Sequence, residues 1–163
     1  MSPRLHPAVF LVATACSGRD DTAGDTAGGF ELVAGTYLYS NVQVLDDGCN
    51  VAKHTHPESL DGTTTAITEV TETTVVFNGD GPGEMKYTRE GNTFTWERVD
   101  DIDRTMEGID CVMTVVGRFE DELVADNDIE WLNTISAEGT GTACDMPIPC
   151  ETRIRGWLTL QVE

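Results

Sequence analysis

Hydrophobic and polar residues alternate with a period of two from about residue 30 to the end of the chain. That period is typical of β-strands that bury one face. Runs rich in β-branched and aromatic residues predict strands over 35–44, 73–77, 85–89, 93–97, 111–119, 129–135 and 153–160. A turn over 120–122 is expected to follow the fifth of these runs. The longest connection, 46–62, could hold a short helical turn.

The phase of the alternation also predicts which side chains face the core. The first strand carries three apolar side chains on one face: Leu38, Val42 and Val44. The hairpin that turns at 90–92 points a set of large side chains inward: Met85, Tyr87, Phe94 and Trp96. Trp131 is in phase with its apolar neighbours and is expected inside. Trp157 is out of phase with its own and is expected to be the most exposed tryptophan.

Seven or eight strands joined by short turns must protect their edges from pairing with other chains. Closure into an antiparallel up-and-down barrel of about eight strands achieves this, and a two-sheet β-sandwich is the alternative. Hairpins that recur every 8–12 residues or so favour the barrel. We therefore predict an all-β chain in which residues 30–163 form a single domain.

One short motif adds support for the barrel. Gly35-Thr36-Tyr37 lies on the first predicted strand, and Arg153 and Arg155 lie on the last. This arrangement is similar to that of lipocalin-like (calycin) β-barrels, in which a Gly-x-Trp on the first strand packs against a late basic residue. Here Tyr37 takes the place of the tryptophan. The resemblance implies a barrel of that kind.

Residues 1–15 have the organisation of an export signal. A single cation, Arg4, precedes a short apolar run that ends in the small residues 13–15, and Cys16 follows. Small residues followed by cysteine resemble the lipobox of bacterial lipoproteins, although Ala13 stands where that family usually carries leucine. The resemblance implies a signal peptide over 1–15 and a lipidated Cys16. Such a cysteine carries more than one acyl chain, which makes a stable membrane anchor.

Residues 16–29 are expected to act as a flexible tether between the lipid and the domain. After the cysteine they contain no large apolar side chain, and Asp-Thr-Ala-Gly occurs there twice in tandem. Ser17 follows the cysteine where inner-membrane lipoproteins can carry aspartate, which favours the outer membrane of the bacterial cell envelope. The alternatives are an ordinary secretory signal beside an incidental cysteine, or a soluble N-terminal tail.

Four cysteines remain in the domain: Cys49, Cys111, Cys144 and Cys150. An even number in an exported chain suggests two disulfides, which can pair in three ways. Only a short loop, stiffened by two prolines, separates the last two cysteines. We therefore favour Cys144–Cys150 together with Cys49–Cys111. A zinc site is disfavoured because the chain has no Cys-x-x-Cys pair.

Charge restricts the classes of partner. The chain has 29 Asp and Glu residues against 10 Lys and Arg, a net charge of −19. Such a field repels phosphate backbones and anionic lipid headgroups. Nucleic acid is therefore not an expected partner, and contact with a membrane is expected only through the lipid on Cys16.

Metal and catalytic chemistry have little support. His54 and His56 form a His-x-His pair, which in an extended segment would place both rings on one side for zinc or copper. A third ligand would have to come from the same loop, and two ordinary loop histidines are the simpler interpretation.

The acidic groups over 100–103 and 126–130 do not fit EF-hand spacing. No hydrolase or phosphate-loop motif is present. We predict no metal, no cofactor and no enzymatic activity.

Two functions remain. The first is a lipid-anchored, non-enzymatic structural or interaction protein with an envelope protein as partner. The alternative is a lipocalin-like carrier of a small apolar ligand. An interior cavity above about 300 Å³ with apolar walls would favour the carrier, whereas a core filled by aromatic side chains would exclude it.

Overall fold

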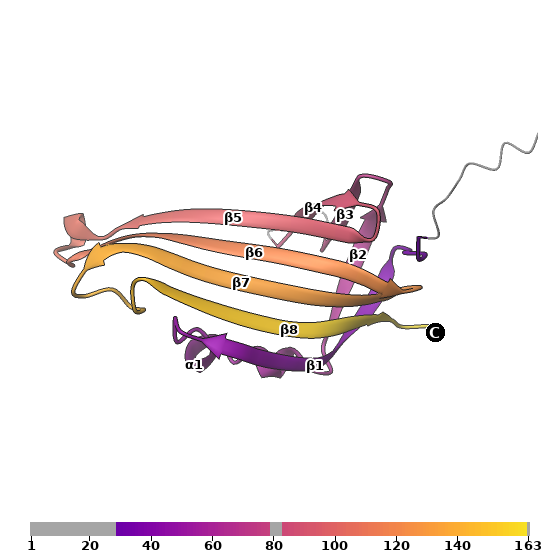
Figure 1. The fold of residues 1–163 in the computed structure, drawn as a ribbon, viewed down its shortest axis with the longest axis horizontal. Coiled ribbons are helices and arrows are strands. Elements are labelled where there is room, and N and C mark those ends of the chain that lie inside the picture. The colour runs from indigo at the N-terminus through magenta and orange to yellow at the C-terminus, as the bar shows by residue number, and fades with distance from the viewer. Residues whose placement is uncertain (1–28, 79–82, 163) are drawn as a thin grey trace, which may run out of the picture.

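The chain forms one closed antiparallel β-barrel in the computed structural model, which describes residues 29–78 and 83–162 (Figure 1). Eight strands follow one another around the barrel in chain order, and the last pairs with the first. The strands are β1 (Gly35–Asp47), β2 (Thr64–Val70), β3 (Thr74–Phe77), β4 (Met85–Glu90), β5 (Thr93–Asp103), β6 (Cys111–Ala125), β7 (Asp128–Gly141) and β8 (Cys150–Leu160). The predicted up-and-down barrel is confirmed, and closure rules out the sandwich.

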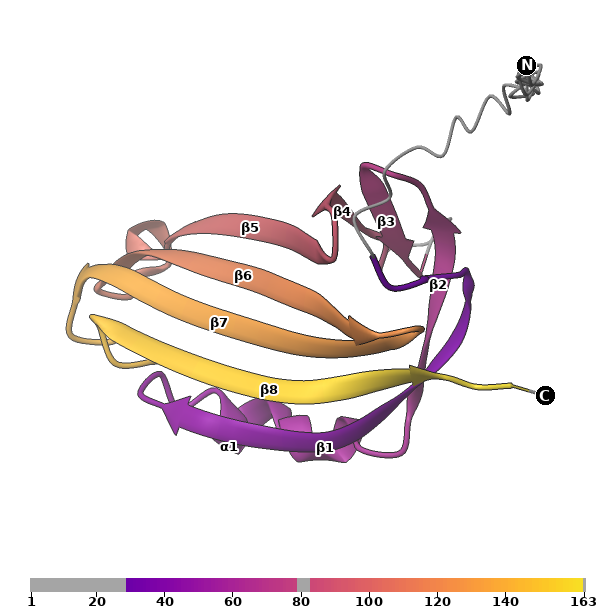
Figure 2. The ribbon, with the colours of Figure 1, turned by 45° about the vertical axis from the view of Figure 1, so that its right-hand side comes forward.

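The strands differ in length, which gives the barrel a long and a short side. β5 to β8 run for 11 to 15 residues, whereas β2 to β4 run for 4 to 7. Figure 2 shows the long strands as a curved wall that extends beyond the short ones. The connection between β1 and β2 contains α1 (Ala52–Thr55) and η1 (Pro57–Leu60) and lies close to β1. The helical turn expected in this connection is confirmed.

β1 changes its inward face halfway along its length. Asn41 has a φ of 52°, and the pairing with β8 slips at this point. Tyr37 and Tyr39 contact the core before this bulge, and Val42 contacts it afterwards. The prediction that Leu38 shares a face with Val42 is wrong, because one added residue reverses the alternation.

β6 continues straight through the turn predicted at 120–122 and ends at Ala125. Its ladder with β7 is unbroken in this region. Glu120 and Glu122 are exposed, whereas Asp121 between them is only 2% exposed and faces the barrel interior. The predicted turn is wrong because the acidic run belongs to a strand, with two of its carboxylates in solvent and one inside.

The interior contains a cluster of aromatic rings around Tyr87. Phe77, Phe94, Trp96 and Phe119 all lie near its ring, with centroid distances of 4.9 to 6.4 Å. The four inward side chains predicted for the 85–97 hairpin all pack in or against the core. Outside this cluster, Trp131 is 5% exposed, as predicted. Trp157 is half-buried on the outer face, where the Arg155 guanidinium lies 5.1 Å from its ring centroid.

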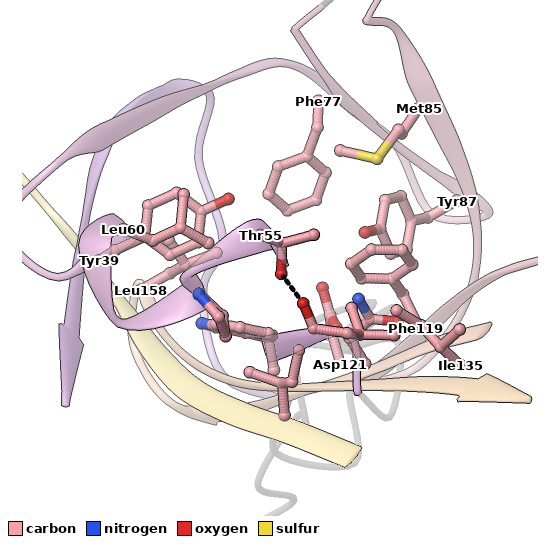
Figure 3. Close-up of a pocket in the computed structure, with 15 residues that line it drawn as sticks. Tyr39, Thr55, Leu60, Phe77, Met85, Tyr87, Phe119, Asp121, Ile135 and Leu158 are labelled. Atoms are coloured by element: carbon pink, nitrogen blue, oxygen red, sulfur yellow. Dashed lines mark hydrogen bonds between the residues drawn. The ribbon is translucent and has the colours of Figure 1, made fainter. Parts of the chain in front are cut away.

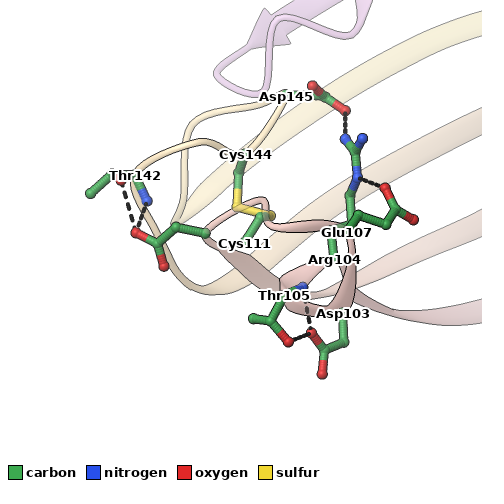
Figure 4. The surroundings of a disulfide bond; sticks show 9 residues. Asp103, Arg104, Thr105, Glu107, Cys111, Thr142, Cys144 and Asp145 are labelled. Carbon is green, nitrogen blue, oxygen red and sulfur yellow. Dashed lines mark hydrogen bonds and ion pairs between the residues drawn. A yellow bond between two sulfur atoms is a disulfide. The ribbon is translucent and has the colours of Figure 1, made fainter.

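Two disulfides tie the long strands together, but not in the favoured pairing. The bonds are Cys49–Cys150 and Cys111–Cys144, of which Figure 4 shows the second. The predicted Cys144–Cys150 and Cys49–Cys111 pairs are wrong. The physical reason is strand register: β1 meets the start of β8 at the pair Asp47 and Thr152, which brings Cys49 to Cys150.

The second disulfide fastens the β7–β8 loop to the beginning of β6. In the ladder, Cys111 lies opposite Gly141, so Cys144 reaches it after a short excursion. Figure 4 shows Arg104, next to η2 (Thr105–Glu107), bridging Glu107 and Asp145 beside this bond. Cys144 therefore pairs with Cys111, which is close to it across the strands, and not with Cys150, which is close to it in the sequence.

The predictions for the N-terminus lie outside the described residues. They concern the signal peptide over 1–15, the lipidated Cys16 and nearly all of the tether over 16–29. Within 29–78 and 83–162, none of the helices has the length and apolar character needed to cross a membrane.

Candidate functional site

A cavity of about 370 Å³ lies inside the barrel, beside the helical connection between β1 and β2 (Figure 3). Ligand pockets in proteins typically measure about 300–1,000 Å³. The cavity is lined mainly by apolar and aromatic side chains from both the long and the short side of the barrel: Tyr39, Phe77, Met85, Tyr87, Phe119, Trp131, Ile135, Ile154 and Leu158. The aromatic core is therefore incompletely filled, and the space left is large enough for a small molecule.

The cavity opens beside the helical connection. Thr55 on α1 and Leu60 on η1 both line it, and both are exposed to solvent. Pro57 lies between them and is buried. A residue that lines a cavity and also contacts solvent marks its opening, so α1 and η1 form the rim through which a ligand would enter.

One carboxylate lies inside this apolar space. Asp121 is 2% exposed, and its Oδ1 atom has no hydrogen-bond partner among the described residues. Burial raises the pKa of the Asp121 carboxyl well above its usual range, and a hydrogen bond from the backbone of Leu132 opposes that rise. A buried polar atom without a partner is costly, and folded proteins pair almost all such atoms. Asp121 is therefore the leading candidate in this cavity for a residue that contacts a ligand.

Two tyrosines lie close enough to Asp121 to interact with it electrostatically. Burial raises the pKa of the Tyr39 hydroxyl, and the nearby Asp121 charge raises it further, against the effect of a hydrogen bond with Thr65. Burial and Asp121 raise the pKa of Tyr87 in the same way. Both phenols therefore stay neutral, and the cavity presents one titratable carboxyl group among neutral aromatic side chains.

Two further polar atoms are buried in the wall next to Asp121. Trp131 Nε1 and Asn133 Oδ1 also lack hydrogen-bond partners within the part of the chain that the structure describes. Gly156 allows the indole to sit there, because a Cβ at this position would lie 2.7 Å from Trp131 Nε1. Asp121, Trp131 and Asn133 thus form a polar patch in an otherwise apolar wall.

The histidines singled out in the sequence belong to a different place. His54 lies in α1, and His56 ends it with a φ of 47°, so the extended segment assumed for metal binding is wrong. His56 Nδ1 lies 3.5 Å from Glu58 Oε1 on the surface. The described residues contain no group of three metal-binding side chains. Neither histidine lines the cavity.

Tyr37 and Arg155, two of the residues that resemble the calycin arrangement, have partners on different strands and loops. Tyr37 is fully buried, and its hydroxyl donates to the Val33 carbonyl oxygen at 2.7 Å. Arg155 lies on the outer face, where Nη1 is 3.4 Å from Glu130 Oε1. The tyrosine thus bonds the segment before β1, whereas Arg155 pairs with an acidic residue of β7.

Sequence reasoning missed Asp121 because its neighbours are acidic and the segment resembled a turn. The period-two pattern would have revealed it, since Phe119, Asp121 and Leu123 are spaced as inward residues of one continuous strand. Comparison with known proteins adds no candidate function: no protein-family model, curated protein or solved structure matches this chain.

Proposed function

We propose that this chain is a non-enzymatic binding protein that holds one small, mainly apolar molecule inside its barrel. The cavity carries this proposal: it measures about 370 Å³ and is lined mostly by apolar and aromatic side chains. Those are the properties stated above as favouring a carrier over a purely structural protein. Among the described residues that line it, Asp121 is the sole carboxylate, whereas glycoside hydrolysis requires two.

The proposal predicts that the protein binds a neutral apolar probe at one site. The purified full-length chain is expected to enhance the fluorescence of N-phenyl-1-naphthylamine with a saturable dissociation constant of about 1–100 μM. The variant Thr55→Trp should weaken that binding at least about tenfold, because the indole would occupy the opening. Thr55 is exposed on α1, so the replacement does not disturb the core.

The matched control is Thr73→Trp, which places the same side chain at an exposed position in the β2–β3 turn, away from the cavity lining. This variant should bind the probe like the unmodified protein. Fluorescence that does not saturate, or equal binding by both tryptophan variants, would contradict a cavity-bound ligand.

We also propose that the barrel is held on a bacterial membrane by lipid on Cys16, with the outer membrane as the favoured location. Support comes from the sequence alone, namely small residues followed by cysteine and then an acidic, Gly-rich stretch. A lipid at that position would leave the barrel in the aqueous phase, where its opening remains accessible to a diffusing ligand.

Replacing Cys16 by Ala should abolish incorporation of labelled palmitate and move the protein from the membrane fraction to the soluble fraction. The physical reason is that the acyl chains supply the attachment. Ser17→Ala is the control, and it should leave labelling unchanged. Membrane retention by the Cys16→Ala variant would show that the anchor lies elsewhere.

A further inference from the structure

An apolar cargo alone does not account for the polar patch in the cavity wall. Asp121 and Trp131 lie directly opposite each other on β6 and β7, and Asn133 is the next inward residue on β7. Cβ atoms of directly opposed residues are about 4.5–5.5 Å apart, so these three groups meet on one area of the interior. Each of these three residues has a buried polar atom without a partner among the residues described, and two of those atoms are acceptors, Asp121 Oδ1 and Asn133 Oδ1.

Aromatic rings surround this patch. Tyr39 meets Trp131 edge to face, with ring centroids 5.9 Å apart. Tyr87 and Phe119 line the cavity beside Asp121, and their centroids are 6.2 Å apart. Figure 3 shows Asp121 and these two rings around the same space. Aromatic faces attract cations, and Trp and Tyr do so most strongly.

The charge of the whole chain favours the same kind of ligand. A net charge of −19 attracts cations to the opening and repels carboxylates. The described lining residues include no lysine, arginine or histidine that could neutralise an anionic ligand. A ligand with a carboxylate would thus face an acidic surface and then an acidic residue.

We propose, on the basis of the proposed ligand-binding function, that the cavity selects a small amine cation with an aromatic or alkyl body. The ammonium group donates hydrogen bonds to Asp121 Oδ1 and to Asn133 Oδ1, and the apolar body packs among Phe77, Met85 and Ile154. Charge-assisted hydrogen bonds of this kind are stronger than neutral ones. The cation supplies a donor to Asp121 Oδ1, which has none among the described residues.

Proton release accompanies this binding. Burial favours the protonated Asp121 carboxyl in the empty cavity, so the arriving ammonium group pairs with a carboxylate that has given up its proton to solvent. The other titratable groups in the described lining are the phenols of Tyr39 on β1 and Tyr87 on β4, which stay neutral. Affinity for an amine should therefore rise with pH until Asp121 is ionised, while affinity for a neutral analogue stays constant.

Three indoles of similar size test the proposal: tryptamine as the cation, 3-ethylindole as the neutral form and indole-3-propionate as the anion. Isothermal titration against the full-length chain at pH 7.5 or so should show tryptamine binding at least about tenfold tighter than 3-ethylindole. The anion should bind weakest. Titrations in two buffers of different ionisation enthalpy, repeated over a range of pH, should show that tryptamine alone releases protons at the pH values where the free protein holds Asp121 protonated.

The Asp121→Asn variant separates charge recognition from general binding. It keeps the size of the side chain and should abolish the preference for tryptamine over 3-ethylindole, together with proton release. A cooperative thermal unfolding transition and a native-like circular dichroism spectrum show that the variant is folded, and its affinity for 3-ethylindole is the reference against which the tryptamine preference is measured. Asp46→Asn, an exposed site on β1, is the control and should retain the preference.

The outcomes distinguish failure of the ligand-binding function from failure of the amine preference. If the unmodified protein binds neither 3-ethylindole nor the naphthylamine probe, the proposed function fails. If it binds them but binds tryptamine no more tightly, the ligand-binding function stands and the amine inference fails. Tightest binding of indole-3-propionate, lost on Asp121→Asn, would also overturn the amine inference, because Asp121 would then act as a protonated donor to an acid.

Discussion

Removing the Cys49–Cys150 disulfide is expected to lower the free energy of unfolding by about 4–5 kcal/mol, measured by urea denaturation of the Cys49→Ala, Cys150→Ala double variant. The bond joins residues 101 positions apart, so cutting it releases a long loop of the unfolded chain. A loop of about 100 residues corresponds to about 4.7 kcal/mol in the chain-entropy treatment. A background of Cys16→Ala keeps lipid out of the measurement.

The other disulfide provides the internal comparison. Cys111 and Cys144 are 33 positions apart, and their replacement by Ala should cost about 3–4 kcal/mol. Each double variant should keep the remaining disulfide, detectable as one linked peptide pair after proteolysis without reduction. A linked peptide joining Cys144 to Cys150 in the unmodified protein would contradict the connectivity described above. A larger loss from the shorter loop would contradict the dependence on loop length expected here.

Replacing Asp121 by Asn is expected to stabilise the empty protein at high pH, by about 1–3 kcal/mol, and to change little at low pH. Burial raises the folded-state pKa of Asp121 well above 3.8, the ordinary value of an aspartate in an unfolded chain. The folded state therefore holds its proton more tightly than the unfolded state does. Stability from this group is complete below that unfolded value and is lost as pH rises through the folded pKa.

The measurement is the difference in unfolding free energy between the variant and the unmodified protein, taken from pH 4 to pH 9 or so in the absence of ligand. This difference should grow with pH. The exposed Asp46→Asn variant corrects for general effects of removing one negative charge from an acidic chain. A stabilisation that does not depend on pH, or a loss of stability at high pH, would show that the Asp121 carboxylate has a partner in the folded state.

The two results together would show that different residues of this barrel supply its stability and its ligand binding. The disulfides join the ends of the long strands and stabilise the fold. Asp121 lines the cavity, and its ionised form lowers the stability of the ligand-free protein. A ligand that pairs with Asp121 stabilises the folded state in proportion to its affinity and concentration. Tryptamine should therefore raise the thermal stability of the unmodified protein more than that of the Asp121→Asn variant.

Much of the architecture follows from the sequence because strand pairing obeys local rules. The alternation at 85–97 placed Tyr87 and Phe94 in the core correctly, and the same phase placed Trp131 inside. Turn residues between short strands, with no long helical pattern, were enough to predict an up-and-down barrel. These features depend on residues close together in the chain, whose pattern is visible without the fold.

Local patterns failed where one residue changed the phase or where distant strands met. The bulge at Asn41 reversed the face of β1, and the acidic run around Asp121 concealed a strand that continues. The disulfide pairing was wrong because Cys49 and Cys150 are joined by the register of β1 against β8, which no local spacing reveals.

The cavity depends most completely on the tertiary structure. Its lining comes from positions between Tyr39 and Leu158, and its volume is what remains after those side chains pack. Residue types in a sequence do not determine the volume of a cavity, since that volume depends on how closely a few large rings and Gly156 pack together. The sequence by itself determined an all-β chain with a large negative charge and favoured a barrel over a sandwich, because these follow from residue pattern and composition. Only the three-dimensional packing decided that Asp121 lies in the wall of an open, mainly apolar cavity.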